Sequence, residues 1–399
     1  MDKDELAFTY FPDNYRWSHG MLLPLGGAPW GGGEIGEVHR VALKLRERLT
    51  SDGEAAAKNI VDDRAWFEEW TAMAEIVEKA GRERAAAGKD ASAAGYLFRA
   101  AHYYHVGERF LQPKDAAGLA AYQRGVDCFR DAARRIRRPR IEHVEVPYEG
   151  TSLPALFVHP EGTTGRAPAL VYFDGFDVTK EIQYFKGVAD LVARGIACLI
   201  VDGPGNGEAI RFRNLPLHHE TERYATAAYE YLRTRAEIDP ARVGVMAISL
   251  GGYYAPRAAA FEPRFAACIA WGAQWDYHAV WKDRLARIVR GETLSLSVPW
   301  QHLLWIFGVA TPEEALKRLE GFKLDGVVQK IRCPFLLVHG EGDAQIPLAT
   351  AQKCFDLVGS TKKTFKVFTR EEGGYHHCQV DNVSIGVAYM WDWLEDALK

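Results

Sequence analysis

The stretch that decides the fold reads VGVMAISLGGYYAPRAAA and runs from residue 243 to residue 260. Its first six residues form an apolar run that predicts a buried strand, and the residues after Gly251 and Gly252 have the pattern of a helix. Ser249 lies between the two. A serine at this position often does no more than cap the helix. A sharp turn would instead expose its hydroxyl group at the end of the strand, so we interpret Ser249 as a candidate nucleophile.

The residues around Ser249 are similar to a known turn. AISLG, residues 247–251, resembles the G-x-S-x-G nucleophile elbow of α/β hydrolases, in which small residues on both sides of the serine let a strained backbone pass. Alanine replaces the first glycine and is small enough for the same turn. In that fold an acid and then a histidine follow the serine along the chain. The elbow therefore predicts two further catalytic residues beyond residue 249.

Two aspartates are candidates for the acid. Asp343 stands in LLVHGEGDAQIPLATA, residues 336–351, in a glycine-flanked turn after an expected strand at 335–338. Such a turn places a carboxylate at the carboxyl edge of a parallel sheet, where ligands bind. Asp276, after the preceding expected strand, is the alternative. The turn residues favour Asp343.

Two adjacent histidines are candidates for the general base. His376 and His377 lie in REEGGYHHCQVDN, residues 370–382, after the last expected strand. One of them would take the proton of the serine and be oriented by the acid. Their position in the chain suits both, so the residues alone leave this choice open.

An oxyanion hole requires two backbone N–H groups, one of them from the residue after the nucleophile, which is Leu250. The second is expected from VYFDGFDVTKE, residues 171–181, where Gly175 and Phe176 follow a strand and glycine permits close approach. We expect Lys180 and Glu181 to cap the next helix or to pair locally. The glycine-rich DGPGNGE, residues 202–208, lacks the lysine of a phosphate-binding loop and predicts a tight turn.

The second half of the chain, residues 141–399, alternates apolar runs with helical patterns, such as those at 185–195 and 221–237. This alternation predicts an α/β fold with a mostly parallel, doubly wound sheet. The expected strands lie within residues 141–149, 153–160, 168–176, 197–205, 243–249, 266–272, 334–343 and 364–369.

The first half, residues 1–140, has helical periodicity instead. Asp62 or Asp63 can cap a helix with one apolar face, and similar patterns recur at 92–111 and 119–136. The sequence therefore predicts an N-terminal helical domain followed by an α/β domain.

Composition excludes several kinds of partner. The net charge of −4 over 399 residues gives no field that would gather nucleic acid or an anionic membrane. The first residues lack the features of a signal peptide, and no apolar run is long enough to span a bilayer. The six cysteines have neither C-x-x-C nor metal-ligand spacing. We expect a soluble cytoplasmic protein that binds a small molecule, with no metal or cofactor.

Several blocks resemble one group of α/β hydrolases, which includes 2,6-dihydroxypseudooxynicotine hydrolase and the fungal polyketide-shortening hydrolases of yellowish-green pigment synthesis. These blocks are GFDVTKE, DGPGNGE, AISLGGYYAPRAAAFEPRFAACIAWGAQWDYH, HGEGDAQIP and GGYHHCQVDN. The resemblance covers residues 141–399 well and the helical half in outline. It implies a helical cap domain, a homodimer, and a triad of Ser249, Asp343 and His377, the histidine before cysteine.

The resemblance also implies cleavage of a carbon–carbon bond next to a carbonyl group, through an acyl-enzyme. One acidic residue of that group is missing here, because the corresponding AQWDYHAVWKDR contains no glutamate. Asp276, His278 and Asp283 are possible replacements. An insertion at about 276–330 is expected to act as a lid. Aromatic and polar residues near it are substrate-pocket candidates: Gly175, Tyr253, Trp275, Asp276, Tyr277, His278 and Trp281.

Two other interpretations remain open. The same triad would serve an esterase, lactonase, amidase or acyltransferase acting on an aromatic substrate. A protein of another class, a non-catalytic ligand receptor or scaffold with this fold, would also keep the architecture. Because Ser249, Asp343 and His377 occur in the order that the fold requires, the sequence favours an enzyme over a non-catalytic protein. The resemblance implies that its substrate is a β-diketone or an acyl-aromatic, polyketide-like compound.

Overall fold

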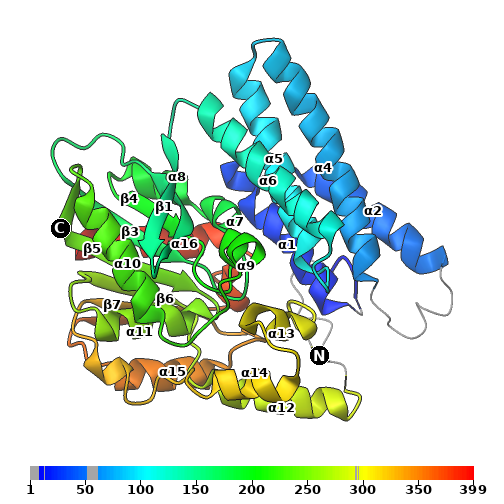
Figure 1. The fold of residues 1–399 in the computed structure, drawn as a ribbon. Helices are drawn as coiled ribbons and strands as arrows, with labels where there is room; N and C mark the ends of the chain where they lie inside the picture. The colour runs from blue at the N-terminus through cyan, green and yellow to red at the C-terminus, as the bar shows by residue number, and fades with distance from the viewer. Residues whose placement is uncertain (1–8, 13, 52–61, 293, 295) are drawn as a thin grey trace. The chain divides into compact units, whose positions relative to one another are not determined.

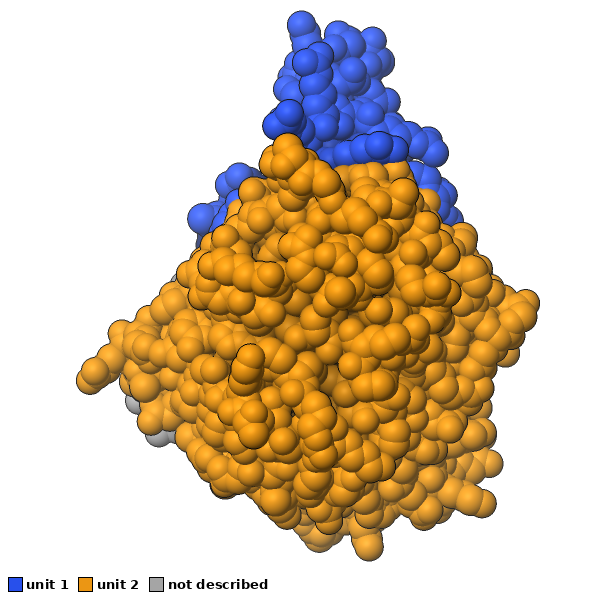
Figure 2. All heavy atoms as spheres, turned by 90° about the vertical axis from the view of Figure 1, so that its left-hand side faces the viewer, with its two compact units in different colours: residues 1–141, 295–302 blue, residues 142–294, 303–399 orange. Residues whose placement is uncertain are grey.

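The computed structural model describes residues 9–12, 14–51, 62–292, 294 and 296–399. The chain divides into two compact units, which Figure 2 shows in different colours. One unit comprises residues 1–141 and 295–302, and the other comprises residues 142–294 and 303–399. The first is helical, and the second contains the sheet.

Long amphipathic helices build the first unit. Asp62 caps α4 by accepting hydrogen bonds from the N–H groups of Arg64 and Ala65, which confirms one of the two predicted caps. The predicted apolar face of α4 is buried, and Trp66 and Trp70 lie at its centre. The helices are α1 (Tyr15–Gly27), η2 (Ala28–Trp30), α2 (Ile35–Ser51), α4 (Asp63–Ala86), α5 (Asp90–Arg109) and α6 (Ala116–Arg135).

An eight-stranded sheet forms the core of the second unit, in the order β1-β2-β4-β3-β5-β6-β7-β8. Figure 1 shows the central strands of this sheet side by side. Strands β3 to β8 pair in parallel, and β2 pairs antiparallel to β4. All eight predicted strands are present: β1 (Ile141–Tyr148), β2 (Thr151–Val158), β3 (Ala167–Phe173), β4 (Ala197–Val201), β5 (Ile238–Ile248), β6 (Ala267–Trp271), β7 (Phe335–Gly340) and β8 (Lys363–Phe368).

Helices cover the sheet. Every residue of β4, β6 and β7 is therefore buried. Helices α10 and α11 pack beside each other on β5, and α16 packs on β6 and β7. The helices of this unit are α7 (Lys180–Tyr184), α8 (Val188–Ala193), α9 (Gly207–Arg213), α10 (Thr221–Thr234), α11 (Gly251–Phe261), α12 (Tyr277–Val289), α14 (Pro312–Leu319), η3 (Val328–Lys330), α15 (Leu348–Leu357), η4 (His377–Gln379) and α16 (Val383–Ala397). Helix α13 (Gln301–Phe307) belongs to this unit from Leu303 onward.

The helical pattern at 185–195 gives a shorter helix than expected, since α8 contains only six residues. Gly187 precedes it with φ of +74°. A side chain there would place its Cβ 2.2 Å from Cγ1 of Val387, and the Gly187 carbonyl accepts a hydrogen bond from the Trp391 indole. The helix therefore begins only after the chain has passed α16 closely. In the described residues, each helix is too short or too polar to span a bilayer.

Candidate active site

Ser249 occupies a strained turn between β5 and α11. Its φ of +62° lies in the left-handed region, which is unfavourable for a residue with a side chain. The turn is held because the Ser249 N–H donates a 2.8 Å hydrogen bond to the Trp271 carbonyl of β6. A Cβ at Gly251 would lie 2.4 Å from the Ala247 Cβ, and one at Gly252 would lie 2.3 Å from the Gly272 carbonyl oxygen. The predicted need for small residues around the serine therefore has a steric cause.

Ser249, His377 and Asp343 form an unbroken chain of hydrogen bonds. Ser249 Oγ lies 2.8 Å from His377 Nε2, and His377 Nδ1 lies 2.7 Å from Asp343 Oδ2. An ionised carboxylate only accepts hydrogen bonds, so Nδ1 carries a proton and Nε2 is left to receive the proton of Ser249. The other oxygen of Asp343 accepts from the N–H groups of Gln345, at 2.7 Å, and Ile346, at 2.9 Å.

His377 and Asp343 shift each other's pKa. Burial alone would lower the pKa of His377, but the Asp343 carboxylate outweighs it and the pKa lies well above its usual value. Burial alone would raise the pKa of Asp343, but His377 and the backbone N–H groups keep it below its usual value. The arrangement thus stabilises an imidazolium next to a carboxylate, which is the charge pair that forms when a serine loses its proton.

His376, the alternative base, lies elsewhere. Its N–H donates a 3.1 Å hydrogen bond to Oδ1 of Asp381, whose other oxygen accepts from the N–H groups of Gly374 and Tyr375. The loop then turns through Cys378 and Gln379, with φ of +52° and +50°. The structure therefore brings His377, and not His376, to Ser249. The Asp381 carboxylate, which accepts hydrogen bonds from three N–H groups, fixes the loop that precedes His377.

The predicted oxyanion loop lies against the elbow. A Cβ at Gly175 would be 2.3 Å from the Ile248 carbonyl oxygen and 2.9 Å from the Leu250 nitrogen. Only glycine fits this contact, which brings the backbone of Gly175 and Phe176 to the N–H group of Leu250. The Tyr254 hydroxyl, 3.3 Å from the Gly175 carbonyl, holds the loop from the side of α11.

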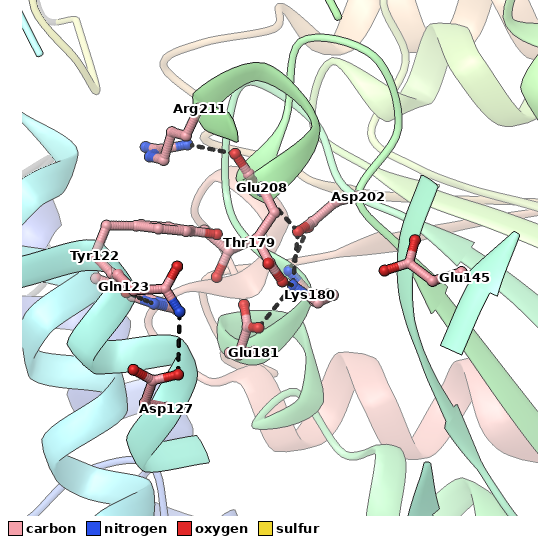
Figure 3. Close-up of polar contacts among 12 residues, drawn as sticks. Tyr122, Gln123, Asp127, Glu145, Thr179, Lys180, Glu181, Asp202, Glu208 and Arg211 are labelled. Atoms are coloured by element: carbon pink, nitrogen blue, oxygen red, sulfur yellow. Dashed lines mark hydrogen bonds and ion pairs between the residues drawn. The ribbon is translucent and has the colours of Figure 1, made fainter. Parts of the chain in front are cut away.

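A buried lysine anchors the same loop (Figure 3). Lys180 Nζ lies 2.7 Å from Glu181, 2.9 Å from Asp202 and 2.6 Å from Glu208. Burial alone would lower the pKa of Lys180, but the three carboxylates raise it well above its usual value. Burial raises the pKa of Asp202, and Lys180 opposes that shift. The local pairing expected for Lys180 therefore extends to the tight turn at 202–208, which the sequence did not connect with this loop.

The remaining pocket candidates fall into two groups. Tyr277 and Trp281, on α12, pack against Phe176, with ring centroids 6.2 Å and 5.9 Å from its own. The others have structural contacts or lie nearer the surface. The Tyr253 hydroxyl donates hydrogen bonds to two carbonyl oxygens, and the Trp275 ring faces the Lys353 ammonium. Asp276 caps α12 and pairs with Lys323. His278 is half-buried in the first turn of α12.

Neither acidic residue proposed to replace the missing glutamate is placed as a free carboxylate. Asp276 accepts a 2.9 Å hydrogen bond from the Ala279 N–H, and Asp283 is mostly exposed, 3.8 Å from Arg287. The structure instead places Arg284 next to Trp281, with 5.4 Å between its guanidinium carbon and the ring centroid. Within the described residues, no three His, Cys, Asp or Glu side chains are placed to hold a metal ion.

The strand order, the elbow and the Ser249–His377–Asp343 chain define a serine hydrolase of the α/β hydrolase class. The profile of the prolyl oligopeptidase family matches residues 183–399, and that of the FrsA-like esterases matches residues 39–288. Each match spans more than half of the chain. The protein therefore belongs to these α/β hydrolase families.

Individual relatives agree with this assignment. The chain is 30% identical to the 2,6-dihydropseudooxynicotine hydrolase of Paenarthrobacter nicotinovorans, over 84% of each protein. It is 27% identical to the 20-hydroxy-prefusarin hydrolase FUS2 of Gibberella moniliformis, over 94% of each. The solved structure of 2,6-dihydroxy-pseudo-oxynicotine hydrolase matches with a TM-score of 0.72 and 28% identity, covering 94% of this chain and 95% of that one. The resemblance inferred from the sequence is confirmed.

Proposed function

We propose that the protein hydrolyses a carbon–carbon bond next to a carbonyl group, with Ser249 as nucleophile, His377 as general base and Asp343 as the acid that orients it. The observation that supports this role is the continuous hydrogen-bond chain from Ser249 Oγ to Asp343 Oδ2 at the end of a strained elbow. The N–H groups of Leu250 and Phe176 would hold the oxyanion. The helical domain, residues 1–140, would act as a cap.

In this mechanism His377 Nε2 takes the Ser249 proton while Oγ attacks the carbonyl carbon. Collapse of the tetrahedral adduct breaks the bond to the neighbouring carbon, which leaves with the electron pair as an enolate. The enolate takes the proton from His377 Nε2 and departs as a ketone. Water, deprotonated by His377, then hydrolyses the acyl-enzyme, and a carboxylic acid and free Ser249 are released. A β-diketone supplies such a leaving group. An acylphenol supplies an equivalent one, because its ring carbon takes the proton from His377 and the aromatic product departs as a phenol.

Ester hydrolysis is the second candidate, because the profile of FrsA-like esterases covers residues 39–288. It uses the same residues and differs only in the leaving group, an alkoxide or phenoxide in place of an enolate. Comparing benzoylacetone with phenyl acetate, and identifying the products by mass spectrometry, separates the two activities.

The triad is tested first with a serine-reactive fluorophosphonate and mass spectrometry of the adduct. We expect labelling at Ser249 that is lost in Ser249→Ala and His377→Ala and retained in His376→Ala. Wild-type protein that is folded, as judged by circular dichroism, and remains unlabelled would contradict the enzyme and favour a non-catalytic receptor or scaffold. Labelling lost in His376→Ala but kept in His377→Ala would reverse the assignment of the base.

A further inference from the structure

Arg284, on the second turn of α12, is a cation without a carboxylate partner in the part of the chain that the structure describes. Three residues further along the same helix, Arg287 pairs with Glu292 at 2.7 Å. Arg284 is only half-buried, yet it turns toward an aromatic cluster formed by Phe176, Tyr277 and Trp281. An arginine directed into aromatic surroundings without a counter-charge requires an explanation.

Contacts on two sides place the guanidinium next to the active site. On the first side, Arg284 lies over Trp281, whose ring stacks at 27° on that of Phe176, the proposed oxyanion residue. On the second, Arg284 Nη2 lies 3.3 Å from Oε1 of Gln345, whose N–H binds Asp343 at 2.7 Å. Arg284 therefore lies between Trp281, which packs on the loop that would bind the oxyanion, and the turn that carries the acid.

Tyr277 and Gln345 are neighbours of the Arg284 guanidinium. Burial raises the pKa of the Tyr277 phenol to about 12, and the positive charge of Arg284 opposes this shift. The Gln345 amide supplies a neutral acceptor at a long distance of 3.3 Å, which leaves the remaining donors of the planar guanidinium for another acceptor. A guanidinium prefers paired oxygens of an anion, and low-dielectric aromatic walls strengthen that attraction.

We propose that Arg284 is a specificity-determining residue that binds an anionic oxygen of the substrate, so that the substrate class is an acyl compound with a carboxylate or an ionised enol or phenol. This inference rests on the proposed function for the reaction itself. It assigns a substrate contact in the segment where the expected glutamate is missing, and it gives that contact a positive charge in place of a negative one.

Matched pairs of esters test the charge preference. In each pair one compound carries a carboxylate and the other carries its methyl ester. The anionic compounds are mono-para-nitrophenyl glutarate, with the carboxylate on the acyl side, and para-acetoxybenzoate, with the carboxylate on the leaving-group side. We expect Arg284→Gln to lower kcat/KM for the anionic member of at least one pair by about 10- to 100-fold, and by less than about 2-fold for both neutral members. Arg284→Lys should keep part of the preference. Arg287→Gln, the matched control, should leave all four rates unchanged.

Binding to Ser249→Ala separates this inference from the proposed function, because it requires no turnover. By calorimetry, the double variant with Arg284→Gln should bind the anionic member of a pair that shows the kinetic preference about 10- to 100-fold more weakly than Ser249→Ala does, with no change for its methyl ester. Equal binding of anion and ester, or equal losses for both, would overturn the role of Arg284. Hydrolysis that persists in Ser249→Ala would instead overturn the proposed function.

Discussion

Trp271, at the end of β6, donates a 2.5 Å hydrogen bond from its indole Nε1 to Oε1 of Gln379, two residues after His377. The Gln379 amide also donates to the Gly374 carbonyl oxygen, at 3.2 Å, and both groups are buried. Gln379 and Cys378 have positive φ, so the backbone next to His377 is strained. The Trp271 indole therefore holds the turn at residues 378–379, and this turn orients the His377 imidazole.

We predict that Gln379→Leu lowers kcat by about 10- to 100-fold with little change in KM, because it misplaces His377 without touching the substrate. Gln352→Leu, on the exposed face of α15, is the matched control. Steady-state kinetics on para-nitrophenyl butyrate checks the split between kcat and KM. A rise in KM with unchanged kcat would contradict a role in positioning His377.

The pH dependence follows from the raised pKa of His377. Only the neutral imidazole can take the Ser249 proton, so the rate of fluorophosphonate labelling should rise with pH through and above 6.5, the usual value for histidine. Asp343→Asn removes the charge that raises this pKa, and burial then lowers it. We expect the midpoint of the labelling profile to move to lower pH, while the maximal rate falls by about 10⁴-fold. An unchanged midpoint would contradict the coupling of the two residues.

Gly175→Ala should impair the oxyanion loop, because its Cβ would lie 2.3 Å from the Ile248 carbonyl oxygen. If the loop moves away from Leu250, we expect kcat to fall by about 10²- to 10³-fold. Gly95→Ala, on α5, is the control, since a Cβ there meets nothing within 4 Å. Equal activity of the two variants would show that the backbone at 175 and 176 contributes nothing to catalysis.

Lys180→Met should be strongly destabilising, because it removes the buried ammonium that Glu181, Asp202 and Glu208 share. Breaking a buried ion pair in this way costs about 3–5 kcal/mol. Burial raises the pKa of Asp202 and Lys180 opposes that shift, so without Lys180 this carboxyl keeps its proton to a higher pH than in the unfolded chain, and the loss of stability should grow as pH rises. Urea unfolding at pH values near 5 and 8 measures it. Lys44→Met, at an exposed position on α2, is the control and should not move the urea unfolding midpoint. A loss of stability in Lys180→Met that is independent of pH would contradict this account.

The sequence predicted all eight strands, and most directly β4, β6 and β7, because a parallel strand that is buried along its whole length is a continuous apolar run. The elbow identified Ser249, and the glycine-flanked turn identified Asp343. The choice of His377 over His376 required the family resemblance, since the residues themselves suit both positions.

The contacts that support the triad could not be predicted in the same way. Gln379 and Trp271 are 108 residues apart, and Arg284 and Gln345 are 61 residues apart. No local pattern connects such pairs, because the packing of distant strands and helices decides which side chains meet. The missing glutamate suggested Asp276, His278 or Asp283 as its replacement, whereas the residue of that segment that contacts both Trp281 and Gln345 is Arg284.

The hairpin of β1 and β2 lies at the edge of the sheet opposite β8, joined by the turn of Glu149 and Gly150. The candidate catalytic residues follow β3, β5, β7 and β8, so this edge supplies none of them. Gly150 is exposed, and a Cβ added there would meet no atom within 4 Å. An affinity peptide or a fluorescent reporter spliced into this turn would therefore leave the reacting groups undisturbed, and would make the protein convenient to immobilise for screening compound libraries.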